Sequence, residues 1–270
     1  MLIQIIAGLV LAASASAVAF LVHSLTLRGA LAAAVLGTLV FGFGGWQWAV
    51  LLLTFFISSS ALSRAFGQAK QGAEEKYAKG SERDEMQVLS NGGIAGLFVV
   101  LHALSPASLW PWIAFGGALA AVNADTWATE LGILNPGAPR LITALSRQVE
   151  KGTSGGVSIV GTLASLLAAV VIGIPAAFFS PTAPWFLLSV IAVAGLAGSL
   201  VDSLLGATLQ AIYFCPRDQR ETEKHPLHTC GTPTVHVRGW RWLNNDWVNV
   251  ACSITGALLA LGLGILLGLR

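Results

Sequence analysis

Apolar residues occur in long runs along this chain, and short polar connections separate them. Several runs approach the roughly 20 residues that an α-helix needs to cross a bilayer. The pattern therefore predicts an all-α polytopic integral membrane protein. The predicted spans cover residues 2–22, 30–44, 47–63, 91–105, 110–134, 155–179, 185–214 and 247–268.

Composition agrees with a membrane class. Hydrophobic residues make up 55% of the 270 positions, charged residues make up 10%, and the mean hydropathy is +0.73. These values exclude an ordinary soluble protein. The second, third and fourth spans are short, so about eight helices are expected, with seven to nine allowed, in a single domain covering 1–270. The first span lacks a basic leader and is expected to be a retained helix rather than a signal peptide.

Basic residues mark one face of the predicted membrane domain. Every Lys and Arg except Arg270 falls in the connections 23–29, 64–90, 135–154 and 215–246. The positive-inside rule assigns these connections to the cytoplasm and places both termini outside. If the source is prokaryotic, the membrane is the plasma membrane. A net charge of +2 gives no indication of a nucleic-acid partner.

Three acidic residues fall inside apolar spans. Asp125 and Glu130 lie in the segment NADTWATELG, and Asp202 lies in GSLVDSLLGATLQ. A rise of 1.5 Å per residue places all three at similar depth on the cytoplasmic side, which predicts a cytoplasm-facing polar cavity. Carboxylates of this kind suit Mg²⁺. The alternative is that each acid only bonds a neighbouring helix.

Two further segments could contact phosphate groups. In KGTSGGVSIVGTLAS, Lys151 and the residues Gly152, Thr153, Ser154, Gly155 and Gly156 precede the sixth span, where glycine amides and a helix N-terminus could cradle a phosphate. The spacing is not that of a P-loop, and helix capping or close packing is the alternative. In RDEMQVLSNGG, Arg83, Gln87 and Asn91 have helical spacing and could meet a substrate headgroup, unless they belong to a solvated loop.

The last basic connection contains two more polar groups. Asn245 and Asp246 lie at the entrance of the last span, where Asp246 is a natural helix cap and the set could also join a site. Cys215, His225, His228 and Cys230 are residue types that bind Zn²⁺, but their separations do not match the usual C-x₂₋₄-C or H-x₃₋₅-H spacing, so a zinc site is not expected. Gly264-x-x-x-Gly268 predicts a helix contact within one chain or in a homo-oligomer.

The segments RDEMQVLSNGG, NADTWATELG, KGTSGGVSIVGTLAS, GSLVDSLLGATLQ and GWRWLNNDWVN, in this order, resemble domain-of-unknown-function family ninety-two, the membrane family that includes plant phytyl-phosphate kinase. This family is similar to membrane CTP-dependent lipid kinases and, more distantly, to phosphatidate cytidylyltransferases. The resemblance implies a membrane phosphotransferase that uses CTP, or a related nucleoside triphosphate, to convert an isoprenyl monophosphate of the phytyl or geranylgeranyl type to its diphosphate.

The resemblance implies nucleotide binding by Asp125 and by Lys151, Gly152, Thr153 and Ser154. The chemistry of the other polar residues completes a hypothesis for the site. Asp125, Lys151 and Asp202 are candidate catalytic residues, and Asp125, Glu130 and Asp202 are candidate Mg²⁺ ligands. The remaining candidates bind the nucleotide (Asn123, Lys151, Gly152, Thr153, Ser154, Gly155 and Gly156) or the acceptor phosphate (Arg83, Gln87, Asn91, Asn245 and Asp246). Two alternatives stay open: a broken-helix transporter or flippase of a prenyl phosphate or small anion, and a cytidylyltransferase that makes a CDP-lipid.

Overall fold

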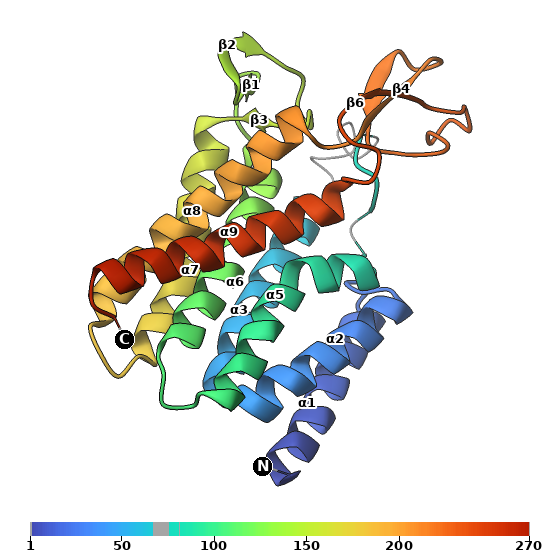
Figure 1. Ribbon diagram of the computed structural model, residues 1–270. Coiled ribbons are helices and arrows are strands. Elements are labelled where there is room, and N and C mark those ends of the chain that lie inside the picture. Colours follow the sequence, from blue (N-terminus) through green and yellow to red (C-terminus); the bar gives the residue numbers. More distant parts are fainter. Residues whose placement is uncertain (1, 67–75, 81, 270) are drawn as a thin grey trace.

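A computed structural model describes residues 2–66, 76–80 and 82–269 of the chain. Residues 67–75 and 81, which belong to the predicted 64–90 loop and include Lys70, lie outside the described residues. The described part forms a bundle of long helices (Figure 1). These helices are α1 (Leu2–Leu21), α2 (Leu27–Leu39), α3 (Trp46–Ala65), α5 (Glu85–Leu104), α6 (Trp110–Gly132), α7 (Ile159–Phe178), α8 (Pro184–Thr208) and α9 (Asn245–Leu266).

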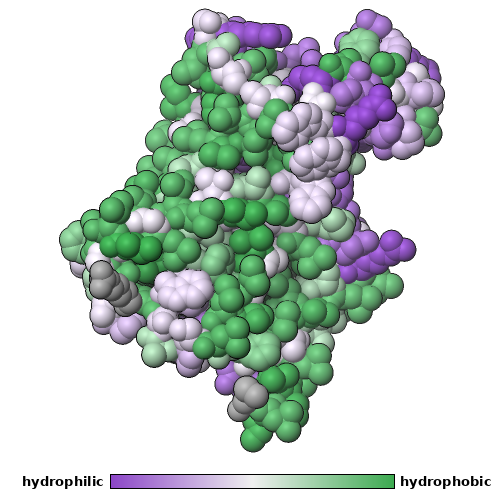
Figure 2. Space-filling view, viewed as in Figure 1, coloured by the Kyte–Doolittle hydropathy of each residue, from purple (hydrophilic) through white to green (hydrophobic). Residues whose placement is uncertain are grey.

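The predicted helical membrane architecture is confirmed. Among the described residues, seven helical segments are long and apolar enough to cross a membrane, and α2 reaches this length with the short π-helical turn η1 (Val40–Gly44) that continues it. The helix α6 is long enough but is not in this set. Figure 2 shows apolar residues over the helical body and polar residues gathered at one end.

Several predicted boundaries need correction. The helix α5 begins at Glu85, so the end of the predicted 64–90 loop is helical. The predicted sixth span starts too early, because α7 begins at Ile159. The seventh ends too late, because α8 stops at Thr208 and a strand follows.

The polar connections also contain two small sheets that the sequence did not predict. The first is antiparallel in the order β2-β1-β3, and the second is antiparallel in the order β5-β4-β6. Both lie at the same end of the bundle, away from the two termini (Figure 1). The strands are β1 (Arg140–Leu141), β2 (Ala144–Gln148), β3 (Gly156–Val157), β4 (Ile212–Cys215), β5 (Arg220–Thr222) and β6 (Val235–Arg238).

The helix α6 forms the centre of the bundle. It packs against α3, α5, α7, α8 and α9, and every residue from Pro111 to Ala124 is buried. Small residues permit this close packing. At the crossing of α6 and α9, a Cβ atom added at Gly117 would overlap the carbonyl oxygen of Gly256, and the reverse is also true.

The predicted Gly264-x-x-x-Gly268 contact does not form one helical face. Gly264 packs inside the chain, where an added Cβ would lie 3.2 Å from Ile113 Cδ1. Gly268 lies beyond the end of α9 and has a φ of 73°. The described contact is therefore within one chain.

We predict that Gly256→Ala destabilises the bundle. The new methyl group would overlap the α6 backbone, and overpacking of this kind typically costs about 1 to 3 kcal/mol. Gly262→Ala on the same helix is the matched control, because a Cβ there meets nothing within 4 Å. Thermal unfolding in detergent should show a lower midpoint for Gly256→Ala than for Gly262→Ala, and equal midpoints would contradict the packing described for α6 and α9.

Candidate functional site

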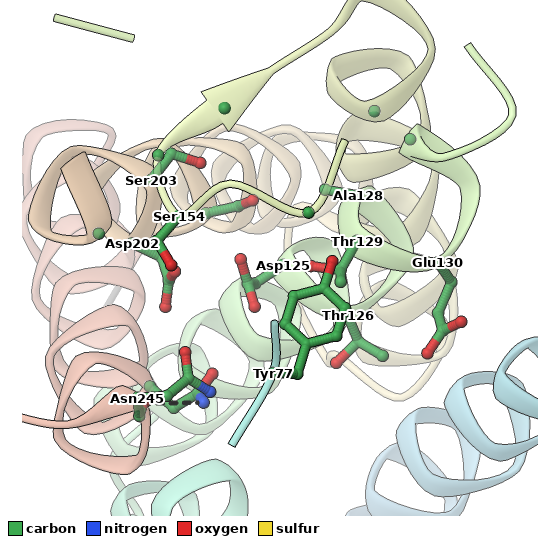
Figure 3. A pocket seen from close by; sticks show the side chains of 18 of the residues that line it. Tyr77, Asp125, Thr126, Ala128, Thr129, Glu130, Ser154, Asp202, Ser203 and Asn245 are labelled. Carbon is green, nitrogen blue, oxygen red and sulfur yellow. Dashed lines mark hydrogen bonds between the residues drawn. The ribbon is translucent and has the colours of Figure 1, made fainter. Parts of the chain in front are cut away.

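A cavity of about 310 Å³ lies among the sheet-side ends of the helices (Figure 3). Its wall comes from α3, α5, α6, α7, α8 and α9 and from the connections between them. Every sequence-predicted catalytic, magnesium, nucleotide or acceptor residue except Asn123 lines it: Arg83, Gln87, Asn91, Asp125, Glu130, Lys151, Gly152, Thr153, Ser154, Gly155, Gly156, Asp202, Asn245 and Asp246.

Two carboxylates face each other across this cavity. Asp125 on α6 and Asp202 on α8 point toward one another in Figure 3, and their side chains are in hydrogen-bonding contact. Within the described residues, the buried Oδ2 atom of Asp202 has no hydrogen-bond partner. Two adjacent carboxylates cannot both carry charge cheaply, so this pair needs a proton or a cation. Their oxygen atoms fit a hard divalent cation such as Mg²⁺.

A third carboxylate, Glu223, approaches this pair from the loop after β5. Its Oε1 atom accepts hydrogen bonds of 2.8 Å from the Ser154 hydroxyl and from the Gln210 amide, and the Ala78 amide donates to Oε2. Burial raises the pKa of the Glu223 carboxyl, while these three hydrogen bonds lower it and leave the net shift upward. The loop is held in place because the Glu223 amide donates to the carbonyl of Lys76 over 2.8 Å.

The glycine-rich segment connects β2 to β3 of the first sheet instead of leading directly into a helix. Gly155 has a φ of 82°, and an added Cβ would lie 2.6 Å from the backbone nitrogen of Ala207 on α8. The segment therefore needs glycine to approach α8. Because β3 intervenes, Ser158 and not this segment caps α7.

Two backbone amides of the predicted phosphate-binding segment already donate hydrogen bonds to carbonyls of the chain. The amides of Thr153 and Gly156 donate to the carbonyls of Glu150 and Thr153. Lys151 is exposed at the edge of the cavity, where its Nζ atom lies 2.7 Å from the carbonyl oxygen of Ile133. A bound anion would have to use Lys151 and the other amides of the segment, or the Ser154 hydroxyl after it turns away from Glu223.

Arg83 and Glu130 form a second polar group, separate from the aspartate pair. Arg83 donates to the Ser60 hydroxyl, and Ser63 donates to Glu130 over 2.7 Å. Burial lowers the pKa of Arg83 to about 10, and the charge of Glu130 opposes this shift. Figure 3 shows Glu130 pointing away from Asp125 and Asp202. Glu130 therefore lies apart from the aspartate pair, and its charge acts on Arg83.

Lys79 connects two helix entrances beside the cavity. Its Nζ atom lies 2.7 Å from Asp246 and 2.9 Å from Asp84. Burial lowers the pKa of Lys79, but the hydrogen bonds to both carboxylates outweigh this and raise it. Asp84 caps α5 in a capping box with Gln87. Gln87, a predicted acceptor-binding residue, therefore takes part in helix capping.

Two predicted roles need correction at the remaining positions. Asn244, not Asp246, caps α9 by accepting from the Trp247 amide. Asn123 is fully buried between helices, where it donates to the Ala168 carbonyl and accepts from the hydroxyls of Ser58 and Ser59. It holds α6 against α3 and α7 and does not line the cavity.

The comparisons with known proteins agree with these features. The model of the family described as "Integral membrane protein DUF92" matches residues 10–257. The chain belongs to this family. Protein PGR of Arabidopsis thaliana is 32% identical over 259 residues, which cover 87% of this chain and 88% of that protein.

Other relatives are less informative by name. An uncharacterized membrane protein, MJ0933 of Methanocaldococcus jannaschii, is 36% identical over 68% of this chain and 74% of its own length. Protein VTE6, chloroplastic, of Arabidopsis thaliana is 26% identical over 89% of this chain and 66% of its own length. No solved structure matches the chain.

Sequence reasoning missed Glu223, Lys79 and Tyr77, all of which line the cavity of this family member. Each lies in a polar connection that also contains other charged or polar residues. Glu223, for example, lies within RDQRETEK, where local spacing does not distinguish it from Glu221. Only the folding of β5 against β4 directs Glu223 toward the cavity, and that pairing has no clear sequence signal.

We predict that Glu130→Gln destabilises the protein because Arg83 would lose its opposing charge in an enclosed position. Leaving this guanidinium without that compensating charge should cost about 1 to 3 kcal/mol. Glu85→Gln is the control, because Glu85 pairs with the exposed Arg28 at 3.5 Å and its loss should cost less than about 0.5 kcal/mol. Unfolding by denaturant in mixed micelles measures both. Adding Arg83→Met to Glu130→Gln should restore part of the loss, and equal effects of the two single variants would contradict this electrostatic interaction.

Proposed function

We propose that the protein is a CTP-dependent isoprenyl monophosphate kinase that makes the prenyl diphosphate by Mg²⁺-assisted phosphoryl transfer at the cytoplasmic side of the membrane. The donor, the acceptor and the side of the membrane come from the sequence resemblance and the positive-inside rule. The contacts around the cavity supply an independent argument for the reaction class.

One observation carries the proposal. The facing pair Asp125 and Asp202 lies in the same cavity as the glycine-rich segment and Arg83. Ser154 connects the glycine-rich segment to Glu223, which approaches the pair. Phosphoryl transfer requires mainly two phosphate-binding groups and charge neutralisation between them. The cavity contains the side chains for each of these parts.

The reaction balances without a strong base. An oxygen of the prenyl monophosphate, already anionic at neutral pH, attacks the γ-phosphorus of CTP. A new P–O bond forms, the bond from that phosphorus to the β,γ-bridging oxygen breaks, and CDP leaves with the electron pair. Asp125 and Asp202 would hold Mg²⁺, which neutralises charge on the transferred group when it is bound.

The two phosphate groups would occupy opposite sides of the aspartate pair. Lys151 and backbone amides of the glycine-rich segment would bind the nucleotide phosphates, while the Ser154 hydroxyl positions Glu223. Tyr77, which projects into the cavity in Figure 3, offers an aromatic face for the nucleobase. Lys79 holds Asp246 and the entrance of α9 beside this space.

Arg83 would bind the acceptor phosphate, with Gln87 and Asn91 beside it on α5. The guanidinium lies 5.7 Å from the ring centre of Phe55 and 5.8 Å from that of Phe56. The headgroup site is thus bordered by aromatic surface, where a prenyl tail would begin. A planar guanidinium in such a place suits a phosphate better than an ammonium does.

The distribution of polar residues favours an enzyme over a transporter. The cavity is lined by α6 residues from Asp125 onward, whereas α6 from Pro111 to Ala124 is buried among neighbouring helices. Alternating access needs a binding site near the midplane that can open to both sides. A polar space confined to one half of the bundle, with close packing in the other half, fits catalysis at one surface.

The first test is a detergent assay with CTP, Mg²⁺ and phytyl or geranylgeranyl monophosphate. Label from γ-labelled CTP should appear in a prenyl diphosphate. Asp125→Asn and Asp202→Asn should each lower the rate at least roughly 100-fold, the scale expected when one preorganised electrostatic group is removed. Glu85→Gln, outside the cavity, is the matched control and should keep the wild-type rate.

Other outcomes identify the alternatives. Lipid label from α-labelled but not γ-labelled CTP would mean that the protein is a cytidylyltransferase. No labelled lipid with any nucleotide, together with movement of prenyl phosphate in proteoliposomes, would mean that it is a transporter. Diphosphate formation that survives both aspartate substitutions would keep the kinase but reject the assigned roles of the pair.

A binding measurement tests the metal assignment without turnover. Mn²⁺ substitutes for Mg²⁺ at oxygen-rich sites and can be followed by electron paramagnetic resonance. Asp125→Asn and Asp202→Asn should each weaken Mn²⁺ binding roughly tenfold or more. Glu130→Gln should leave binding close to wild type because Glu130 lies apart from the aspartate pair. If Glu130→Gln weakens binding as much as Asp125→Asn does, Glu130 belongs to the metal site as the sequence suggested.

A further inference from the structure

Four potential metal ligands converge outside the cavity, in the connection between α8 and α9. Cys215 ends β4, Asp218 lies in the turn after it, and His228 and Cys230 return from the far side of the loop. One ligand atom from each lies within 4.8 Å of all the others. Cys215 and His228 are buried. The sequence-based set differs in one member, because Asp218 takes the place of His225.

The separations are close to those of a single tetrahedral ion. The Sγ atoms of Cys215 and Cys230 are 3.6 Å apart, and two thiolates bound to one Zn²⁺ at about 2.3 Å would be separated by about 3.8 Å. The Nδ1 atom of His228 lies 2.8 Å from Asp218 Oδ2. A bound ion would replace this contact after a small movement of the Asp218 side chain, which is about one-third exposed.

We propose that Cys215, Asp218, His228 and Cys230 bind one structural Zn²⁺ ion. Two thiolates and an imidazole favour a borderline or soft metal over Mg²⁺ or Ca²⁺. Four protein ligands complete a tetrahedral shell, which is typical of a structural rather than a catalytic zinc site.

Groups around the four ligands support thiolate binding. The Asp218 amide donates to Cys215 Sγ over 3.4 Å, and Thr232 Oγ1 lies 3.3 Å from Cys230 Sγ. Hydrogen bonds from outside the ligand shell orient and stabilise metal-bound sulfur. The backbone around His228 is also fixed, because its amide donates to the Thr232 carbonyl and its carbonyl accepts from the Gly231 amide.

The ion would give this loop a stability that its short strands do not provide. The strands β4, β5 and β6 contain three or four residues each, and small sheets often depend on a metal or another crosslink. The ion would tie the end of β4 to the return segment. Between them lie β5 and Glu223, so the same crosslink would fix the carboxylate that enters the cavity.

His225 provides a matched control inside the same loop. Its ring stacks on Tyr213 with centroids 4.4 Å apart and an interplanar angle of 11°, and it is not in the ligand cluster. Cys252, the third cysteine, is buried in α9. Substitution of either residue changes a zinc-binding residue type without removing a proposed ligand.

The test is the metal content of the full chain, purified in detergent and dialysed after addition of Zn²⁺. Wild type, His225→Ala and Cys252→Ser should each retain about one zinc per chain. Cys215→Ser and Cys230→Ser should retain at least roughly tenfold less. A zinc chelator should lower the thermal midpoint of wild type and His225→Ala but leave that of Cys215→Ser unchanged.

A measurement on wild type alone covers the case in which the cysteine variants fail to fold. Co²⁺ in place of zinc should give the visible absorption of a tetrahedral site and a thiolate-to-metal charge-transfer band. Wild-type protein that binds neither Zn²⁺ nor Co²⁺, or that contains a Cys215–Cys230 disulfide, would overturn the proposal. None of these measurements requires a nucleotide or a lipid, so a failed kinase assay leaves them unaffected.

Discussion

The fold depends on keeping one carboxylate-bearing helix away from lipid. A charged side chain at the centre of a bilayer costs about 2.5 to 3.5 kcal/mol even on permissive scales. The helix α6 carries Asp125 and Glu130, and five other helices surround it. Because its neighbours cover it, α6 needs no apolar outer face. This explains why α6 is long enough to span a membrane but is not apolar enough to qualify by composition.

The same enclosure divides α6 into two halves with different functions. Its first half consists mainly of small and apolar side chains, and glycine lets α9 approach at Gly117 and Gly256. Its second half lines the polar cavity. The cavity is then completed by connections rather than by helices alone. Ser154 lies between β2 and β3 of the first sheet, Glu223 follows β5 of the second, and the two side chains meet at 2.8 Å. This hydrogen bond joins the two sheet-bearing connections over the aspartate pair.

Much of this site was accessible from the sequence because charge inside an apolar run is expensive and therefore informative. Asp125 and Asp202 were placed at one depth by helical rise alone, and the structure places them face to face. Asn123 has the same polar character but fills a structural role, since a buried amide can satisfy its hydrogen bonds between helices. Periodicity cannot distinguish these two outcomes.

The connections were harder to predict for a different reason. Their strands are two to five residues long, too short for an alternating pattern to indicate them. The pairing register decides which side chains of such a strand face the bundle. A shift of one residue would turn Glu221, which is exposed, to the opposite face of the sheet. Asp218 follows Cys215 at the two-residue gap common between zinc ligands, but a carboxylate in a loop with many charges is not recognisable as a ligand from spacing alone.

The spacing on α6 explains how one helix can serve two separate polar groups. Asp125 and Thr129 are four residues apart, as are Thr126 and Glu130, so the two pairs form adjacent stripes about 100° apart around the helix. The first stripe faces α8 and Asp202, and Ser63 donates to Glu130 of the second from α3. One rigid helix thereby contributes Asp125 to the negative pair that can hold a cation and Glu130 to the surroundings of Arg83, which can hold an anion. For a transfer between two phosphate groups, a rigid helix that borders both groups would limit the movement of donor and acceptor relative to each other.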